Sequence, residues 1–503
     1  MSSQAELPVP LNVYEKHWRL FVDDASIKEP ATLPVQNPTR SFWLHPTSEN
    51  PLAKEGSQGA LSKDADICII GSGITGISAA YHLAKAVAGG SGGTNPLKVV
   101  ILEARDFCSG ATGRNGGHLT PAGFLDFGMR KKVMGSKEAL KQYALEAHSV
   151  REITEIIKAN DLEEKVDLVS GGHFDLIFTE DELTEAKSDF EAAKAAGADL
   201  DYVRWFSRDE MIETFGTKYP AAKIHGHNLW PMKYVTQLYY LAQKSFETAH
   251  GSSLRLHTNT PVTSIKSSDD KKRRWSLQTP RGSVSCNIVL HATNGYASHL
   301  LPFLAGPNGI IPTRGQIIAT RAAVSVDSLS RASWSGNEGF EYWFPRPTTS
   351  SENPLVILGG GREIEKDFEL NETDDSIVNK QASKVLRAFL PAVFPGKFDK
   401  KDAPEMEWTG IMGFTKLTDP FVGPVVDLNS NASGKTSYLG QYISAGYTGH
   451  GMPRTYACAE AVVSLILHEM GGGTRDDWVR PDWLPARYLT WVREAADKGA
   501  QGA

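Results

Sequence analysis

Residues 64–87, DADICIIGSGITGISAAYHLAKAV, place three glycines between an apolar run and a segment with apolar residues at helical spacing. The run at 65–70 predicts a buried strand, and the spacing after the glycines predicts a helix. Gly71, Gly73 and Gly76 form the pattern Gly-x-Gly-x-x-Gly. In this pattern the first glycine makes a tight turn, the second lets backbone approach a pyrophosphate, and the third packs helix on strand. The N–H groups at the helix start would then face the phosphates.

A second apolar strand, LKVVILEA at 97–104, ends in Glu103 and completes a predicted β-α-β unit with parallel pairing. A carboxylate at this position can accept hydrogen bonds from the ribose hydroxyls of an adenosine, and it disfavours a 2′-phosphate. The spacing from Gly76 exceeds the usual distance of roughly 20 residues, which a loop insertion at 89–96 explains. The competing interpretation is an ordinary α/β glycine turn with a solvated acid.

The loop CSGATGRNGGHLTP at 108–121 combines glycines and hydroxyl residues with Arg114, Asn115 and His118. Backbone N–H groups in such a loop can lie against a polar planar ligand. A flavin needs donors near N1, O2 and N5, where negative charge arrives with a hydride. A flexible linker is the alternative, but a linker would not need these three side chains.

Together these segments resemble the FAD-binding segments of the D-amino-acid oxidase-like flavoprotein superfamily, closest to its gamma-glutamylputrescine oxidase-like branch, including fungal members. Later segments agree in order: VLHATNGY at 289–296, PTRGQII at 312–318, YWFPRP with LVILGGGRE at 342–363, and ISAGYTGHGMPRT at 443–455. The resemblance covers about 32–472. It implies FAD held by the following residues: Gly71, Ser72, Gly73, Ile74, Thr75, Gly76, Glu103, Ala104, Arg105, Ser109, Gly110, Ala111, Thr112, Gly113, Arg114, Asn115, Gly116, Gly117, His118, Val262, Thr293, Gly446, Gly449, His450, Gly451 and Met452.

The resemblance also implies an α/β fold, in which a Rossmann-like FAD-binding domain with a parallel central sheet is interleaved with an α+β, mixed-sheet substrate-binding domain. Helices are predicted at 137–159, 180–197, 234–251, 376–391 and 453–471, with a capping box at Ser207 and Glu210. Four strand-like segments between 254 and 293 predict an antiparallel meander returning to a buried strand. Residues 1–62 are predicted to form an extended N-terminal arm that docks through Trp18, Phe42 and Trp43. The FAD-binding domain is predicted to consist of 63–128, 222–300 and 405–475, and the substrate-binding domain of 129–221 and 301–404. Residues 476–503 are predicted to form a C-terminal tail.

The reaction implied by the resemblance is oxidation of the C–N bond of an amine or amino acid. Hydride passes to flavin N5, the imine hydrolyses, and O₂ reoxidises the flavin to give hydrogen peroxide. The candidate catalytic residues are Tyr342, Arg346, Arg362 and His450. An arginine can clamp a substrate carboxylate, although solvated or ion-paired arginines are common. His450 is equally consistent with a structural role, and Trp343 is favoured as a core aromatic over a wall of an amine pocket.

The sequence departs at two places from the proteins that it resembles, and both departures bear on the reaction. No lysine stands near PLVILGGGRE at 354–363, where sarcosine-oxidase relatives place an oxygen-activating lysine. Arg114 stands where some dehydrogenase relatives carry a flavin-linked histidine, so we expect non-covalent FAD, with His118 and Cys108 as exceptions to test. The alternatives are an amine dehydrogenase with another acceptor, a non-catalytic flavin-binding protein, and an NAD(P)-linked reductase, which would need a second glycine fingerprint.

Composition narrows the remaining classes. The formal net charge is −6 over 503 residues, and the basic cluster at 271–274 is local, so nucleic acid is an unexpected partner. The four cysteines form no CxxC pair, which disfavours a zinc site and favours a reducing compartment. No apolar run long enough for a membrane span and no secretory leader pattern is found. We expect a cytoplasmic enzyme of small molecules, without a metal; the sequence leaves the oligomeric state open.

Overall fold

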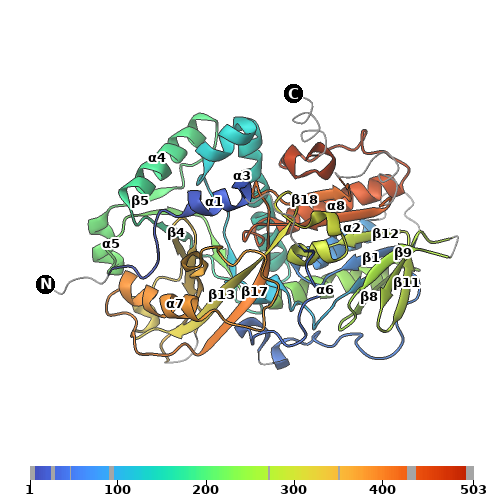
Figure 1. Ribbon diagram of the computed structural model, residues 1–503, viewed down its shortest axis with the longest axis horizontal. Helices are drawn as coiled ribbons and strands as arrows, with labels where there is room; N and C mark the ends of the chain where they lie inside the picture. The colour runs from blue at the N-terminus through green and yellow to red at the C-terminus, as the bar shows by residue number, and fades with distance from the viewer. Residues whose placement is uncertain are drawn as a thin grey trace.

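The computed structural model describes residues 6–23, 29–45, 47–89, 96–269, 272–348, 352–427 and 438–493. Most of the insertion predicted at 89–96, Lys271 of the basic cluster and the end of the predicted tail lie outside these ranges. Two large sheets lie beside each other, each with its own helices, as Figure 1 shows.

The six-stranded sheet carries the glycine turn and has the strand order β18-β19-β12-β1-β2-β8. All neighbours pair in parallel except β18, which is antiparallel to β19. The strand bounds are β1 (Ile67–Ile70), β2 (Lys98–Leu102), β8 (Ser253–His257), β12 (Ile288–His291), β18 (Phe421–Pro424) and β19 (Gln441–Ala445). Because both faces of β1 are covered, all four of its residues are apolar and buried.

Helices cover one face of this sheet and a small meander covers the other. The helices are α2 (Ile74–Ala88), α6 (Pro231–Thr248) and α8 (Thr455–Met470), which pack with Ile67 and Ile69 in one core. The meander consists of β9 (Ser264–Ser267), β10 (Trp275–Thr279) and β11 (Gly282–Cys286). The prediction of a four-segment meander was therefore wrong for its first segment. That segment is β8, which follows α6 back across the sheet and so pairs in parallel with β2.

The second sheet has eight strands in the order β17-β13-β16-β15-β14-β4-β6-β5. It is mixed, because β14 and β4 pair in parallel and its other neighbours are antiparallel. The bounds are β4 (His173–Leu176), β5 (Arg204–Phe206), β6 (Ala221–Ile224), β13 (Ile311–Arg321), β14 (Ser333–Gly336), β15 (Glu341–Pro345), β16 (Leu355–Gly360) and β17 (Met406–Phe414). The fold class predicted from the sequence is thus confirmed.

Helices also flank the second sheet. They are α3 (Phe127–Ala159), α4 (Glu180–Ala195), α5 (Arg208–Phe215) and α7 (Lys380–Val393). Ser207 and Glu210 form the predicted capping box at the start of α5. A two-stranded pair, β3 (His118–Leu119) with β7 (His227–Asn228), forms a small sheet separate from the two large ones.

Two strands bear on the domain boundaries. β17 falls inside the range predicted for the FAD-binding domain, 405–475, yet it pairs along its whole length with β13 of the eight-stranded sheet. β6 straddles the predicted boundary between 221 and 222 and also belongs to that sheet. We therefore propose that 406–414 and 221–224 belong to the substrate-binding domain, and we keep the other boundaries as proposals.

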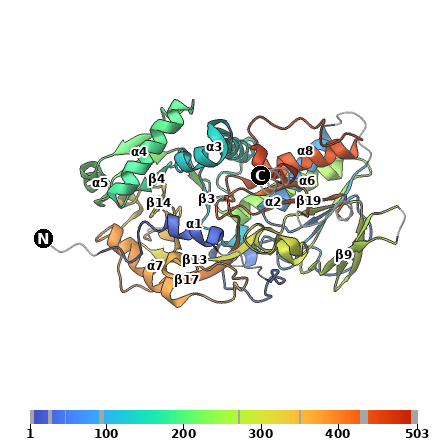
Figure 2. The ribbon, with the colours of Figure 1, turned by 45° about the horizontal axis from the view of Figure 1, so that its top comes forward.

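The N-terminal arm contains a helix that the Pro- and Ser-rich composition did not predict. Helix α1 (Tyr14–Asp23) lies over the region where the two halves meet (Figure 2). Its exposed positions carry charge, as in Glu15 and Arg19, whereas His17 is buried against the body. This alternation is that of an amphipathic helix. Farther on, the 3-10 helix η1 (Phe42–Leu44) docks as expected, because Trp43 is fully buried.

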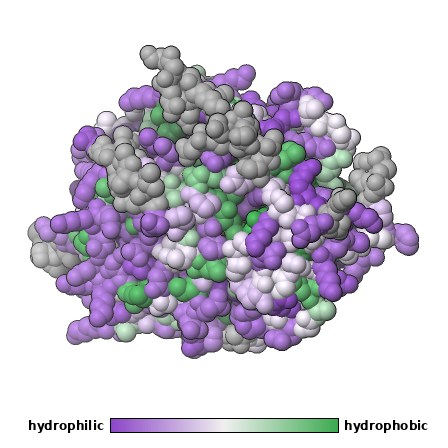
Figure 3. Space-filling model, turned by 45° about the vertical axis from the view of Figure 1, so that its right-hand side comes forward, coloured by the Kyte–Doolittle hydropathy of each residue, from purple (hydrophilic) through white to green (hydrophobic). Residues whose placement is uncertain are grey.

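On the face shown in Figure 3, apolar residues form small groups that are surrounded by hydrophilic residues. Among the described residues, no helix combines the length and the apolar character that a membrane span requires. All four cysteines are buried free thiols.

Candidate active site

A cavity of about 580 Å³ is lined by residues of both large sheets, of the loops that follow their strands and of α1. Most of the residues predicted from the sequence line it: Gly71, Gly73, Ile74, Thr75, Glu103, Ala104, Arg105, Gly110, Ala111, Thr112, Arg114, Asn115, Gly116, Gly117, His118, Val262, Thr293, Tyr342, Arg362, Gly449, His450, Gly451 and Met452. Six predicted residues are not among those that line it: Ser72, Gly76, Ser109, Gly113, Gly446 and Arg346.

The first and third glycines of the turn have the geometry that their spacing predicts. Gly71 has φ +111°, and a Cβ there would lie 2.6 Å from the carbonyl oxygen of Ala292. A Cβ on Gly76 would lie 2.0 Å from the carbonyl oxygen of Gly71. Gly76 therefore acts by permitting close packing inside the turn, away from the cavity surface.

Gly73 and Ile74, at the start of α2, line the cavity. The N-cap of this helix, Gly73, supplies no side-chain cap, and the Ile74 N–H donates to Thr112 Oγ1 at 3.0 Å. Thr75 lines the cavity one residue farther on. Helix starts leave N–H groups without intrahelical partners, and the helix dipole favours an anion there. This end of the cavity suits a pyrophosphate.

Glu103 is buried at the end of β2 and is held in one orientation. Its Oε2 accepts from the backbone N–H and the hydroxyl of Ser72, at 2.9 and 2.8 Å, and its Oε1 accepts from the Arg105 N–H at 2.9 Å. A carboxylate has about four acceptor positions, so these contacts leave one on Oε1. Glu103 can therefore accept from one further hydroxyl, and Ser72, which does not line the cavity, positions it.

Further observations support the fit of FAD to this cavity. The buried hydroxyl of Thr293 has no hydrogen-bond partner among the described residues, and Thr293 lines the cavity. A polar ligand would satisfy this group. The residues before α8, Gly449, Gly451 and Met452, also line the cavity, and its N-cap residue makes no side-chain cap. Two helix starts thus border the cavity. The partial positive charge at a helix start stabilises a phosphate group and also an anionic reduced flavin.

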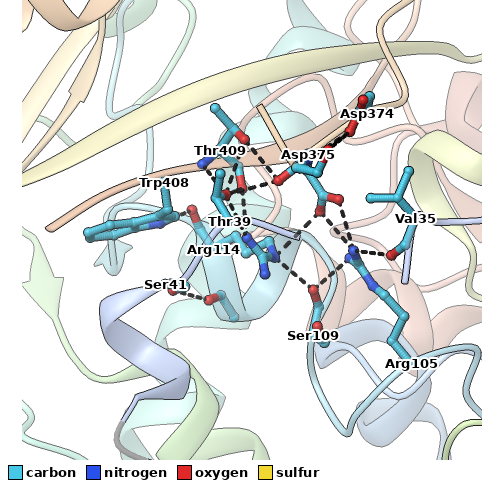
Figure 4. Close-up of polar contacts among 12 residues, drawn as sticks. Val35, Thr39, Ser41, Arg105, Ser109, Arg114, Asp374, Asp375, Trp408 and Thr409 are labelled. Carbon is cyan, nitrogen blue, oxygen red and sulfur yellow. Dashed lines mark hydrogen bonds and ion pairs between the residues drawn. The ribbon is translucent and has the colours of Figure 1, made fainter. Parts of the chain in front are cut away.

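Two arginines predicted to bind the cofactor are engaged with one buried carboxylate (Figure 4). Arg105 Nη1 lies 2.9 and 3.0 Å from the two carboxylate oxygens of Asp375, and Arg114 Nε lies 3.5 Å from Oδ2. Burial lowers the pKa of Arg114 to about 10, so it stays charged at neutral pH. Arg114 Nη1 also donates to Thr39 Oγ1 of the arm and to the carbonyl of Thr409 in β17. This cluster ties the loop at 108–118 to the arm and to the second sheet.

His118 and Cys108, the two exceptions to test for covalent FAD, differ in position. His118 lines the cavity and lies edge-on to Tyr342 and Phe344. Burial, together with His173, lowers the pKa of His118 to about 3, so its ring is neutral. Cys108 is fully buried and does not line the cavity, and burial raises the pKa of its thiol well above the usual range. A neutral thiol is a poor nucleophile.

His450 lines the cavity and is held by a buried acid. Its Nε2 lies 3.2 Å from Glu146 Oε2, while Arg454 Nε donates to Glu146 Oε1 at 2.8 Å. Burial alone would raise the pKa of Glu146, but His450 and Arg454 lower it below its ordinary value of 4.5. This contact gives His450 a structural role, and its imidazole is 37% exposed, so contact with a ligand remains a proposal.

Arg362 and Tyr342 meet at the wall formed by β15 and β16. Tyr342 packs against glycines on both sides, because a Cβ on Gly116 or on Gly359 would lie 2.3 Å from its ring. Burial raises its pKa to about 12. Arg362 is half-buried and lines the cavity, and desolvation lowers its pKa to about 10, which leaves the guanidinium charged at neutral pH. In the described part of the chain it forms no ion pair with a carboxylate within 4.0 Å.

Arg346 is placed differently from Arg362. Its Nη2 donates to Asp167 Oδ2 at 2.5 Å, and its guanidinium carbon lies 5.1 Å from the ring centroids of Trp43 and Trp230. It does not line the cavity. These contacts lock the arm onto the body, so we do not carry Arg346 forward as a substrate contact.

Replacing Arg346 with methionine is expected to lower the free energy of unfolding by about 1–3 kcal/mol, because the ion pair and the aromatic contacts are lost. The value of kcat/KM should stay within about twofold of wild type, since no cavity contact changes. Thermal melts and steady-state kinetics measure the two effects. A drop in kcat/KM without loss of stability would place Arg346 in the reaction after all.

Sequence reasoning missed one polar group at the cavity, on β4 and β14. The sheet register pairs Asp175 with Ser335 and Ser335 with Tyr342, so the three side chains stand in one row across adjacent strands. Ser335 Oγ donates to Asp175 Oδ1 at 2.5 Å, and His173 Nε2 lies 3.1 Å from the same oxygen. In the described part of the chain, neither lysine nor arginine lies within 4.0 Å of the Asp175 carboxylate. No local motif marks Asp175, because only sheet pairing brings it to the cavity.

Comparison with known proteins agrees with this geometry. A family model described as "DAO: FAD dependent oxidoreductase" matches residues 66–465. The chain is 25% identical over 411 residues to gamma-glutamylputrescine oxidoreductase of Escherichia coli (strain K12), covering 80% of this chain and 83% of that protein. It is 23% identical over 431 residues to probable oxidoreductase OrdL of Rhizobium meliloti (strain 1021), covering 84% and 87%.

Among solved structures, glycine oxidase from Geobacillus kaustophilus superposes with a TM-score of 0.61 at 19% identity, covering 81% of this chain and 95% of that chain. At this identity the superposition shows a shared fold.

Proposed function

The chain belongs to the family of FAD dependent oxidoreductases, and on that premise we propose that it oxidises the C–N bond of an amine or amino acid. Membership in the family confirms the predicted resemblance and the predicted cofactor. The names of two relatives support the substrate class, because gamma-glutamylputrescine oxidoreductase and glycine oxidase are named for compounds with an amino group.

The observation that carries the proposal is the state of Arg362. It is a half-buried, charged guanidinium that lines the same cavity as the glycine turn. Glu341 and Glu363 lie near it, but in the described part of the chain neither forms an ion pair with it within 4.0 Å. A buried charge is costly unless a ligand or a partner compensates it. A substrate carboxylate would compensate it, and a guanidinium can bind a carboxylate through two parallel hydrogen bonds. We therefore propose that the substrate carries a carboxylate as well as the amine.

The residues of the chain bind and orient the substrate. Arg362 would hold its carboxylate, the Tyr342 ring would limit its position beside Gly116, and Asp175 would attract its amine. Bound FAD would supply the acceptor for a hydride from the carbon next to the amine, after which the imine hydrolyses and O₂ restores the oxidised cofactor with release of hydrogen peroxide. Correct placement of the reacting carbon supplies much of the rate enhancement in such a reaction.

Three further parts of the proposal each have their own support. Non-covalent FAD is supported by the buried, neutral thiol of Cys108 and by Arg114 in place of a flavin-linked histidine. O₂ as the acceptor follows the general reaction of the proteins that the sequence resembles, although no lysine stands at 354–363, where sarcosine-oxidase relatives place an oxygen-activating lysine. A cytoplasmic location is supported by the four free thiols, which suit a reducing compartment.

The test mixes the purified holoprotein with glycine, L-proline, putrescine and gamma-glutamylputrescine, first without and then with air. The proposal predicts that at least one compound bleaches the flavin and that peroxide appears when air is admitted. Bleaching that persists in air would replace O₂ with another acceptor and make the protein a dehydrogenase. A yellow protein that no amine or amino acid bleaches would contradict the proposed function.

Replacing Asp175 with asparagine is expected to raise the KM for the amine about 10-fold or more, because a half-buried carboxylate attracts an ammonium group far more strongly than an amide does. The flavin spectrum should not change. Asp201→Asn is the matched control, since the Asp201 side chain is 84% exposed in an ion pair with Lys194. An unchanged KM in Asp175→Asn would remove Asp175 from substrate binding.

A further inference from the structure

Helix α1 lies outside the family match at 66–465 but forms part of the cavity wall. Tyr14, His17 and Trp18 all line the cavity. The start of the helix is fixed to the second half of the molecule, because Glu338 Oε2 accepts from the backbone N–H groups of Val13 and Tyr14, both at 3.0 Å. Figure 2 shows α1 crossing between α3 and β13. A segment of the N-terminal arm thus encloses the substrate side of the cavity.

His17 brings a hydrogen-bond acceptor to Arg362. Arg362 Nη1 and His17 Nε2 are 3.1 Å apart, and an arginine can only donate, so the imidazole Nε2 accepts. The two side chains share an aromatic enclosure. The Arg362 guanidinium lies 4.8 Å from the ring centroid of Phe340 and 4.9 Å from that of Phe414, and the His17 ring lies 4.9 Å from that of Phe368.

The charge state of His17 decides what this contact does. Burial, reinforced by the charge of Arg362, lowers the pKa of His17 to about 2. A neutral imidazole fixes the direction of the guanidinium without cancelling its charge. The buried arginines Arg105, Arg346 and Arg454 instead form direct ion pairs with carboxylates. Glu341 and Glu363 lie near Arg362, but in the described part of the chain neither comes within 4.0 Å of it as an ion-pair partner. A carboxylate in the place of His17 would compete with an anionic ligand, whereas a neutral acceptor leaves the positive charge for the ligand.

We infer that His17 is a positioning residue that aims Arg362 into the cavity, so that helix α1 completes the site for the carboxylate of the substrate. The inference rests on the proposed function, in which Arg362 binds that carboxylate. The inference makes binding of the substrate carboxylate beside the second sheet depend on the N-terminal arm, which lies outside the residues matched by the family model.

The first test compares His17→Phe with His17→Gln in the full-length holoenzyme. Phenylalanine fits the aromatic enclosure but offers no acceptor, whereas the glutamine side-chain oxygen can accept from Arg362. We expect His17→Phe to raise KM for a carboxylate-bearing substrate about 10-fold, with a smaller change in kcat, and His17→Gln to recover most of the loss. Activity on the matching amide of that substrate should be unaffected. Arg19→Ala, on the exposed side of α1, is the control and should behave as wild type.

Equal losses for the carboxylate substrate and its amide, or no rescue by glutamine, would overturn the inference and leave His17 a packing residue. So would an unchanged KM in His17→Phe.

The second test does not depend on a substrate. In holoenzyme labelled with ¹⁵N-histidine, His17 should show a non-protonated Nε2 throughout the range from about pH 5 to pH 8, and Arg362→Lys should shift that signal. A His17 ring that titrates within that range would overturn the inference. If no compound bleaches the flavin but His17 behaves as expected, the proposed function has failed while the contact between His17 and Arg362 stands.

Discussion

Arg362→Met is expected to lower kcat/KM for a carboxylate-bearing substrate by about 100-fold or more, while the visible spectrum of the flavin is retained. A buried charge pair that loses one partner costs about 2–5 kcal/mol, and each 1.4 kcal/mol is a factor of ten. Arg362→Lys should recover only part of the loss, because lysine cannot form two parallel hydrogen bonds to a carboxylate. Steady-state kinetics on the substrate and on its amide measure the effect.

Arg346→Met is the matched control for this variant, since it removes another charged arginine of the same domain, one that is buried and does not line the cavity. The two variants should have different effects: Arg362→Met should lose activity and Arg346→Met should lose stability.

Two acids, Glu341 and Glu363, lie near Arg362. Burial, together with the neighbouring Glu363, raises the pKa of Glu341 well above its usual range. Equal kinetics for Arg362→Met on the carboxylate substrate and on its amide would show that Arg362 binds no carboxylate.

Asp375→Asn is expected to lower the free energy of unfolding by about 3–5 kcal/mol, because two buried arginines lose their shared counter-charge. Asp375 is fully buried between Arg105 and Arg114 (Figure 4). Since Arg114 holds the loop at 108–118, the variant should also release FAD more readily. Thermal melts and gel filtration followed by a visible spectrum measure both effects.

The neighbouring residue provides a matched control. Asp374 is only partly buried, and its carboxylate accepts from the backbone N–H and the hydroxyl of Ser376. Asp374→Asn should therefore stay within about 1 kcal/mol of wild type. If Asp375→Asn melts with the control and keeps its flavin, the cluster is not what joins the arm, the loop and the second sheet.

The cofactor half of the cavity could be predicted because its determinants are local in the sequence. Gly71, Gly73 and Gly76 specify a turn within six residues, and Glu103 ends the next strand. Each element has its own signal in periodicity or turn chemistry. The structure refined this half, since Ser72 and Gly76 act behind the cavity surface.

The substrate half could not be predicted, because it depends on tertiary pairing. Arg346 and Arg362 follow adjacent antiparallel strands. The three glycines before Arg362 permit close approach and favour it only slightly, so tertiary pairing decides which arginine lines the cavity. Asp175 reaches the site through sheet register alone. His17 lies in a Pro- and Ser-rich arm whose composition favoured an extended chain, but packing against the body stabilises a helix there.

The most direct test of the central claim is an anaerobic titration of the purified protein with amines and amino acids while its flavin absorbance is recorded. The account predicts a yellow protein that an amine bearing a carboxylate bleaches in wild type but not at the same concentration in Arg362→Met. A colourless protein that FAD cannot reconstitute, or a flavin that no such compound bleaches, would contradict it.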